Sequence, residues 1–436
     1  MSLEPTYRIE PCLLDEVPAA LSDLIAELAQ ASSALGGRLH PLSAASLAEL
    51  VRVMNCYYSN LIEGHNTRPR DIERALVNDL ETDSTRRDLQ LEARAHIRVQ
   101  REVDALCSRG TYGEPASRAR ILWLHREFYA EAPAAFLRIS HVNGDYDMVA
   151  GEFRSEPRHD VAVGRHVPPS SARVDDFMVY FEQRYRFENL GKSSRIMAMA
   201  AAHHRLNYIH PFVDGNGRVS RLMSHAMALE AGIGAHGLWS ISRGLARGLS
   251  DTGEYKRMMD EADSPRRGDL DVRGNLSRAA LVEFVSWFCQ VAYDQVRFMT
   301  GLFDFDKLQE RLSEYVHREL ALPDHAAEIP IEVLRRGELA RASEPRDEDL
   351  RAHRAHRVEC ARERWAADFG NRQEPRQAAV LGLERRRALS KIVWDSSSLA
   401  TLFTERAAPA PMHKGAGFIG GLAPPPEAAA EQRRQE

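Results

Sequence analysis

The twelve residues from His210 to Arg221, HPFVDGNGRVSR, constrain the fold of this chain more than any other stretch. Proline disfavours helical geometry in the residue before it, so the preceding helix should end at Ile209 or His210. Gly215 and Gly217 let the backbone turn tightly and approach a ligand, because neither has a Cβ atom. We therefore expect a short loop that joins two helices.

The same stretch carries groups that bind a nucleotide phosphate. The backbone amides of residues 215–217 lie at the start of the second helix, where unpaired amides and the helix dipole favour an anion. Arg218 and Arg221 are three residues apart, so both project from one helical face and can donate to phosphate oxygens. The carboxylate of Asp214 is a hard oxygen ligand suited to Mg²⁺ between two phosphates. His210, on the opposite rim, can take up a proton near neutral pH.

This stretch resembles the signature of the Fic family, His-Pro-Phe-x-Asp/Glu-Gly-Asn-Gly-x-x-x-Arg, in which arginine commonly follows the last glycine. Members of that family mostly transfer AMP from ATP to a hydroxyl side chain of a protein. The resemblance implies that His210 is the general base and that Asp214 holds Mg²⁺ against the α- and β-phosphates. A related kinase-like branch has lysine where this chain has Gly217, so the glycine favours nucleotidyl transfer over phosphate transfer.

The resemblance also implies a set of ATP ligands within the motif. The side chain of Asn216 and the amides of the two glycines would bind the α-phosphate, and the two arginines would hold the outer phosphates. The implied ATP-binding residues of the motif are Asp214, Gly215, Asn216, Gly217, Arg218, Val219, Ser220 and Arg221.

Most of the remaining chain has the 3.6-residue periodicity of amphipathic helices. We expect helices at 45–62, 71–107, 117–130, 172–188, 193–209, 216–231, 250–262 and 276–299. Leu122, His125, Phe128 and Tyr129 share one side of the third. Glycines and prolines interrupt residues 138–170, which we interpret as containing a hairpin. The predicted fold class is all-α: a Fic-type helical bundle with a small β-hairpin flap, extra N-terminal helices and a C-terminal region without a clear pattern.

The hairpin has a role in the resemblance. In Fic proteins a flap lies over the active site and clamps the main chain of the target by strand addition. Here Gly151–Arg154 and Val163–Pro169 occupy the corresponding positions. The residues implied to border ATP and the incoming hydroxyl are Val163, Gly164, Arg165 and His166. The alternative is an ordinary surface hairpin that contacts no ligand.

A second resemblance lies at the end of the helix 45–62. Ser59, Glu63 and Gly64 match the Fic inhibitory pattern Ser/Thr-x-x-x-Glu-Gly/Asn. A carboxylate that pairs with Arg221 would keep this arginine from the γ-phosphate, and ATP would bind with its α-phosphate misaligned for in-line attack. The pattern therefore predicts autoinhibition by a segment of the same chain. The alternative is that Glu63 is an ordinary solvated residue at a helix end.

Three further residues are interpreted from their context. Tyr255 resembles a family tyrosine that borders the adenine, although an aromatic residue on a helix more often belongs to the core. His203 and His204 are expected to pack or to form hydrogen bonds, because no carboxylate or cysteine accompanies them as a metal ligand.

The expected organisation has five parts. They are an N-terminal helical region at 1–110 with the inhibitory motif at 59–64, a Fic catalytic domain at 116–275, C-terminal helices at 276–330, a degenerate winged-helix region at 331–405 and a disordered tail at 406–436. Residues 335–390 are rich in arginine and contain no lysine. They lack the apolar alternation of a wing, and a basic run is usually a solvated face or a disordered segment.

Composition sets broader limits. The formal net charge of -5 gives no overall attraction to nucleic acid or to an anionic membrane. The five cysteines are scattered and show no metal-type spacing, as in a reducing compartment. The first residues do not form a leader, and no apolar run is long enough to span a bilayer, so we expect a soluble cytoplasmic protein. The implied cofactor is Mg²⁺, and the implied partners are ATP and a protein with an exposed hydroxyl; a homodimer is left open.

The predicted function is that of a protein adenylyltransferase that modifies Ser, Thr or Tyr hydroxyls, including its own, and is inhibited by Glu63. One alternative is transfer from UTP, GTP or another donor, because the motif contacts phosphates rather than the base. Another is removal of AMP by the same site, with Glu63 orienting a water molecule. An alternative of a different class is a regulator with a vestigial Fic domain that binds DNA through the arginine-rich end, which salt-dependent DNA binding would test.

Overall fold

The computed structural model describes residues 4–65, 67–140, 144–268, 271, 274–318 and 327–336. The helices are α1 (Ala19–Gly36), α2 (Pro41–Ile62), α3 (Pro69–Leu76), α4 (Ser84–Ser108), α5 (Arg118–Tyr129), α6 (Ala134–Leu137), α7 (Val174–Tyr185), α8 (Lys192–Ile209), α9 (Asn216–Glu230), α10 (Ile241–Arg247), α11 (Glu254–Ala262), α12 (Arg278–Leu302), α13 (Phe305–Arg318) and α14 (Glu328–Arg336). Two short strands, β1 (Arg138–Ile139) and β2 (Tyr146–Asp147), pair antiparallel. The predicted helical bundle with a small hairpin is confirmed.

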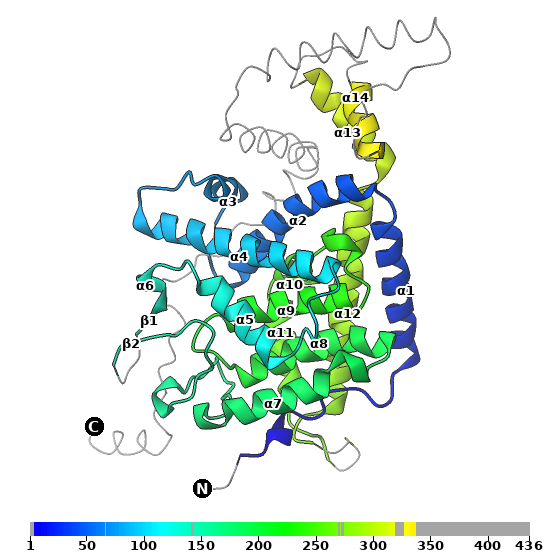
Figure 1. Cartoon of the computed structure of the whole chain (residues 1–436). Helices are drawn as coiled ribbons and strands as arrows, with labels where there is room; N and C mark the ends of the chain where they lie inside the picture. The colour runs from blue at the N-terminus through cyan, green and yellow to red at the C-terminus, as the bar shows by residue number, and fades with distance from the viewer. Residues whose placement is uncertain are drawn as a thin grey trace, which may run out of the picture.

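Helices α8 and α9 form the centre of the bundle. From Ile196 to Ile209, nearly every side chain of α8 is buried, as expected for a helix enclosed on all sides. Helix α8 packs on α7, α9 and α12, α9 also contacts α4 and α5, and α12 packs along α1. In Figure 1, α2 and α4 lie above α8 and α9, and α7 lies below them. Two helices of the N-terminal region therefore lie close to the start of α9.

Local sequence explains where several helices begin and end. The side chains of Asp83 and Ser117 accept hydrogen bonds from the backbone of Arg86 (2.9 Å) and Arg120 (3.3 Å), and so cap α4 and α5. Gly64 follows α2 with a φ of 85°, a conformation that glycine adopts at a helix end without strain. The inhibitory pattern thus coincides with the C-terminal end of α2.

The expected single helix at 71–107 is wrong, because this segment forms two helices. Helix α3 ends at Leu76, and α4 begins only at Ser84. Between them, Asn78 adopts a left-handed conformation with a φ of 59°, which interrupts a helix. Residues 81–88, ETDSTRRD, contain no apolar side chain, so the apolar periodicity is itself interrupted before the second helix. Helices α1 and α10 were not predicted as separate elements.

The hairpin is also placed differently from the prediction. The paired strands are β1 and β2, with Arg138 opposite Asp147 and Ile139 opposite Tyr146. Gly151–Arg154, which we assigned to the flap by resemblance, has no β-pairing. In the other segment, pairing is limited to one isolated bridge between Val163 and His166 across a tight turn.

The C-terminal predictions fall mainly on residues that the structure does not describe. Helices α12 and α13 occupy most of the segment at 276–330, in which C-terminal helices were expected. The proposed winged-helix region at 331–405, beyond residue 336, and the tail at 406–436 lie outside the described residues. In the described part of the chain, no helix is both long and apolar enough to cross a membrane.

Candidate active site

The loop between α8 and α9 has the sharp geometry that the sequence predicts. His210 adopts a left-handed conformation (φ 49°, ψ 62°) directly after α8. Gly215 has a φ of 82°, and a Cβ atom on it would lie 2.9 Å from the ring of Tyr129. The side chain of Asn216 accepts a hydrogen bond from the backbone nitrogen of Phe212 (2.9 Å) and donates one to its carbonyl oxygen (2.8 Å). These two hydrogen bonds join the loop to the first residue of α9 and fix the path of its backbone.

A buried arginine that the sequence did not single out fixes the other side of this loop. Nε of Arg154 donates to the carbonyl oxygen of His210 (2.7 Å), and Nη2 donates to that of Ile209 (3.1 Å). A cation is favourable at these carbonyls because they form the negative end of α8. Burial lowers the pKa of Arg154 to about 10, so the guanidinium stays charged at neutral pH. Its only signal in the sequence was its place in the expected flap.

Asp214 lies in this loop with its carboxylate held from one side. The hydroxyl of Tyr129 donates to Oδ2 (2.6 Å), and Nη2 of Arg218 lies 3.4 Å from the same oxygen. Burial opposes ionisation of Asp214, but Arg218 and the bond from Tyr129 outweigh it and keep the pKa below its ordinary value. The side chain is still 44% exposed, so the ionised carboxylate has a free side. A single accessible carboxylate fits Mg²⁺, which takes its other oxygens from phosphates and water.

Arg221 is in contact with the predicted inhibitory motif. Its Nη2 donates to Oε1 of Glu63 (2.5 Å), and its Nε donates to the hydroxyl of Ser59 (2.9 Å). Burial opposes ionisation of Glu63, but Arg221 and Arg218 outweigh it and lower its pKa. A Cβ atom on Gly217 would overlap the Glu63 carboxylate. This carboxylate therefore lies against the first turn of α9, where a phosphate was expected.

Arg218 meets a second carboxylate of the N-terminal region, which the sequence did not reveal. Nη1 donates to Oε1 of Glu92 in α4 (2.5 Å), and the guanidinium lies 5.3 Å from the ring centre of Phe128. Oε2 of Glu92 faces Nδ1 of His65 (3.1 Å). The hydrogen bond to Glu92 raises the pKa of His65 above its ordinary value, and the charge of the carboxylate acts in the same direction. The two motif arginines thus contact two different acids.

The imidazole of His210 is held in its neutral form. Burial is the main cause, and the positive charge of Arg154 adds to it, so that the pKa falls to about 4. At neutral pH the ring therefore carries a free lone pair. The loop brings together a neutral base, an ionised carboxylate and the start of a helix.

Known proteins match this chain over the same segment. Residues 115–228 match the model of the Fic/DOC family. A segment of 92 residues is 39% identical to "Protein adenylyltransferase Fic" of Drosophila erecta and covers 21% of this chain and 18% of that protein. A segment of 82 residues is 43% identical to the protein of the same name from Drosophila virilis, covering 19% and 16%. Residues 115–228 are a Fic domain.

The fold around the Fic domain also has a known counterpart. The crystal structure of a Fic family protein from Desulfovibrio desulfuricans G20 aligns with 71% of this chain and 86% of that one, with a TM-score of 0.50 and 16% identity. The chain therefore shares its fold with a Fic protein well beyond the Fic domain. The segments that match the two Drosophila proteins span less than a fifth of their length.

The turn between Val163 and His166 lies against the end of α8 in the Fic domain. Nε2 of His166 contacts the carbonyl oxygen of Tyr208 (2.7 Å), and Nδ1 contacts the carboxylate of Asp263 (3.3 Å). Arg165 is 92% exposed, and its guanidinium lies 3.6 Å from the carboxylate of Asp260. Through His166, the predicted flap residues contact Tyr208, which lies two residues before His210 in the chain. Their contact with ATP or a target stays a prediction.

The remaining predicted site residues are buried in the body of the Fic fold. Val219 and Ser220 are 1% and 0% exposed, and the hydroxyl of Ser220 donates to the carbonyl oxygen of Gly217 (2.9 Å). Tyr255 is also buried, and its hydroxyl pairs with Nε2 of His203 (2.8 Å). Nε2 of His204 faces Asp263 at 3.1 Å. Both histidines are therefore packed and hydrogen-bonded, as expected, and contact of Tyr255 with adenine stays a prediction.

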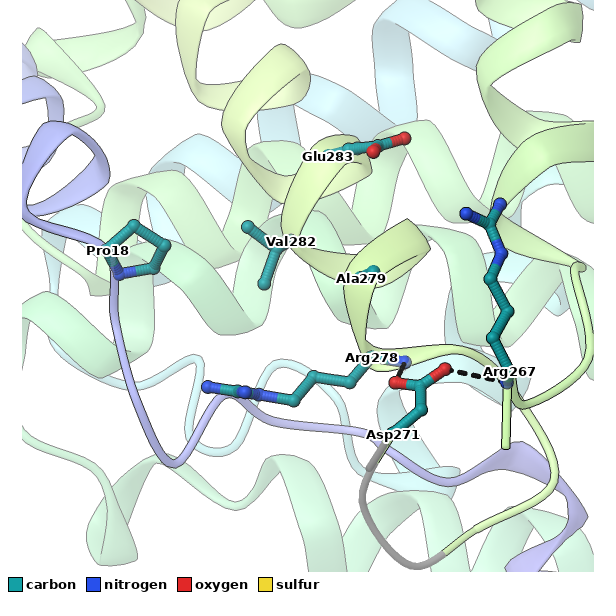
Figure 2. Close-up of a pocket in the computed structure, with 7 residues that line it drawn as sticks. All are labelled: Pro18, Arg267, Asp271, Arg278, Ala279, Val282 and Glu283. Carbon is teal, nitrogen blue, oxygen red and sulfur yellow. Dashed lines mark hydrogen bonds between the residues drawn. The ribbon is translucent and has the colours of Figure 1, made fainter. Parts of the chain in front are cut away.

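Within the described residues, no group of three or more His, Cys, Asp or Glu side chains gathers that could hold a metal ion by itself. A surface hollow of about 460 Å³ lies between Pro18 and the start of α12, as Figure 2 shows. There Asp271 accepts hydrogen bonds from the backbone of Arg267 (2.9 Å) and Arg278 (2.7 Å). None of the predicted site residues lines this hollow.

Proposed function

We propose that this chain is a protein adenylyltransferase, which transfers AMP from ATP to a Ser, Thr or Tyr hydroxyl of a protein. One observation carries the proposal: the loop between α8 and α9 of the Fic domain holds the neutral base His210 and the accessible carboxylate of Asp214 beside the amides that start α9. The name of the Drosophila relatives, which match over the same segment, supports the same activity.

In the proposed mechanism, His210 takes the proton of the target hydroxyl while the hydroxyl oxygen attacks the α-phosphorus of ATP in line. A new oxygen–phosphorus bond forms, the bond to the β-phosphate oxygen breaks, and pyrophosphate leaves. Mg²⁺ held by Asp214 would neutralise charge on the α- and β-phosphates. The backbone amides at residues 215–217 would hold the transferring phosphate, because they are directed in advance at the negative charge.

We further propose that Glu63 inhibits this transfer in the same chain. Its carboxylate is ionised, binds Arg221 and lies against Gly217 at the start of α9. A negative charge at this position repels the outer phosphates of ATP and removes the arginine that would hold them. ATP would then bind with its α-phosphate out of line. Movement of the end of α2 would release the block, because Glu63 caps this helix directly before Gly64 turns the chain.

The position of Glu63 also supports a second candidate activity, the removal of AMP from a modified protein. The Glu63 side chain is 27% exposed and ionised, so it can accept a hydrogen bond from a water molecule beside the phosphate position. An AMP-modified protein incubated with the wild type or with Glu63→Gln distinguishes the two activities. Removal of AMP requires the carboxylate and should be lost in Glu63→Gln, whereas transfer does not require it.

Intact-protein mass spectrometry tests the proposed function directly. Wild type and Glu63→Gly are incubated with Mg²⁺ and ATP, UTP or GTP, alone and with a soluble cell extract. We expect AMP adducts on the chain or on extract proteins, more in Glu63→Gly than in wild type. His210→Ala in the Glu63→Gly background should lose the adducts and still bind ATP. An adduct from UTP or GTP alone would reassign the donor, and no adduct from any nucleotide would contradict the proposal.

A further inference from the structure

Glu92 is a buried acid from outside the Fic domain that reaches into the site. It lies in the middle of α4, and its side chain is 1% exposed. An ionised carboxylate is costly to bury unless it is paired and hydrogen-bonded. The partners of Glu92 are Arg218 on one oxygen and His65 on the other. Both oxygens are therefore used to hold neighbouring side chains in place.

Arg218 lies between Glu92 and Asp214. Its Nη1 donates to Glu92, while its Nη2 faces both carboxylate oxygens of Asp214, at 3.5 and 3.4 Å. A guanidinium is planar and rigid, so fixing one nitrogen, with the guanidinium carbon 5.3 Å from the ring centre of Phe128, also restricts the direction of the other nitrogen. The orientation of Arg218, and with it the contact to Asp214, thus depends on Glu92.

We propose that Glu92 is a positioning residue of the active site: it orients Arg218 and, through Arg218, holds Asp214 ready for Mg²⁺ and the phosphates of ATP. This inference rests on the proposed function. It assigns to the N-terminal region two acids with opposite effects. Glu63 blocks the site, whereas Glu92 is needed to build it.

The surroundings of the two acids support this division. Glu63 is 27% exposed and ends α2 at a glycine, so a local change of the loop can withdraw it from Arg221. Glu92 is enclosed in a helix of 25 residues that packs against α5 and α9 of the Fic domain. It cannot leave Arg218 unless the whole of α4 moves. The contact of Arg218 with Glu92 is therefore a constant part of the site.

The test measures binding of ATP by calorimetry, once with Mg²⁺ and once with EDTA. The parent is the double variant Glu63→Gly/His210→Ala, in which the block is removed and transfer is prevented. We expect the parent to bind ATP more tightly with Mg²⁺. Adding Glu92→Gln should reduce that advantage roughly 10–100-fold, as for other residues that orient a metal ligand. Binding in EDTA should weaken less, because Arg218 keeps its charge and loses only its fixed orientation.

A matched control separates positioning from general support of the fold. Asp104 is another largely buried acid of α4. Its carboxylate contacts Nε2 of His225 in α9 (2.5 Å) and accepts a hydrogen bond from Arg52 (2.7 Å). Asp104→Asn should leave the Mg²⁺ advantage of the parent unchanged. Equal losses in the Asp104 and Glu92 variants, or an equal loss by Glu92→Gln with Mg²⁺ and with EDTA, would overturn the inference.

Two further outcomes are distinguishable. A parent that binds ATP with a Mg²⁺ advantage which Glu92→Gln leaves intact contradicts the inference alone. A parent that binds no ATP contradicts the proposed function and this inference with it. If Glu92→Gln does not fold, as judged by circular dichroism, Glu92→Asp replaces it, because aspartate keeps the charge but withdraws the carboxylate from Arg218. The same loss of the Mg²⁺ advantage is then expected.

Discussion

His210 illustrates how the surroundings of one residue determine its chemistry. A histidine in water is partly protonated just below neutral pH, whereas this ring is enclosed and lies near the guanidinium of Arg154. Both influences disfavour the imidazolium. The pKa of about 4 means that the base is available at neutral pH and is lost only when the pH falls through about 4.

This shift can be measured in the free protein by NMR. The ring signals of labelled histidines are followed from pH 7.5 to pH 3.5, and the spectrum of His210→Ala identifies the signal of His210. We expect a titration midpoint below 5, because burial opposes protonation. Arg154→Lys should lose part of the hydrogen bonding to the carbonyl oxygens of Ile209 and His210. In this variant we expect the titration midpoint of His210 to change. A midpoint above 6 in the wild type would contradict the environment described for this ring.

The sequence predicted the chemical groups of the site better than their partners. The motif named His210, Asp214 and Arg221 because it specifies residue types at fixed spacing, and the pairing of Arg221 with Glu63 is present as the inhibitory pattern implied. Glu92 and Arg154 were missed for a physical reason. Each acts through a contact between residues far apart in the chain, and no short pattern records such a contact.

At the scale of elements, the four-residue turn at 163–166 depends on its anchors. A single β-bridge holds the turn together, so its place beside His210 is set by His166, which contacts Tyr208 and Asp263. The carboxylate of Asp263 also meets Nε2 of His204. Since Arg205 can only donate, to Nδ1 of His204 at 2.7 Å, the proton of that ring lies on Nε2 and points to Asp263.

We therefore predict that Asp263→Asn loosens the turn. In the Glu63→Gly background, KM for the protein substrate should rise severalfold, because the predicted flap clamps the target. The affinity for ATP should fall less, because its phosphates are expected to bind to the motif loop and the start of α9. Steady-state kinetics and calorimetry measure the two quantities. Asp260→Asn is the matched control: its pair with Arg165 is exposed on both sides and contributes little. An unchanged KM in Asp263→Asn, or an equal rise in both variants, would show that Asp263 does not anchor the turn.

Elements with strong periodicity and clear caps were predictable, whereas those defined by backbone detail were not. The helices before and after the motif end close to the predicted positions, because Ile209 precedes a His-Pro pair and Asn216 follows a glycine with positive φ. The break between α3 and α4 depends on the left-handed conformation of Asn78 and on the side chain of Asp83, which starts the second helix. The absence of apolar residues at 81–88 marks the break in the sequence, but the ends of the two helices depend on these two residues.

At the scale of the whole molecule, the site is shared between the Fic domain and the helices before it. The motif arginines lie on α9, and their acids come from the end of α2 and the middle of α4, more than 100 residues earlier in the sequence. Any change that moves α2 or α4 relative to α9 therefore alters the charge around the phosphate position. The proposed regulation by Glu63 and the proposed positioning by Glu92 would therefore use the same interface.

The last prediction tests this coupling through Glu63 and Arg221. Glu63→Gly removes a carboxylate that binds Arg221 and repels phosphate. Both consequences favour ATP bound in the geometry for transfer, and a free-energy change of about 1.4 kcal/mol corresponds to a tenfold increase in that population. We expect AMP transfer to rise at least severalfold at subsaturating ATP, measured by incorporation of labelled AMP. Glu63→Gly/Arg221→Ala should return to a low rate, because the gain requires the freed arginine. A change that merely loosens the end of α2 would also speed transfer, but that gain would survive in the double variant. If the rates of wild type and Glu63→Gly are equal at every ATP concentration, the ion pair with Arg221 joins α2 to α9 without controlling transfer.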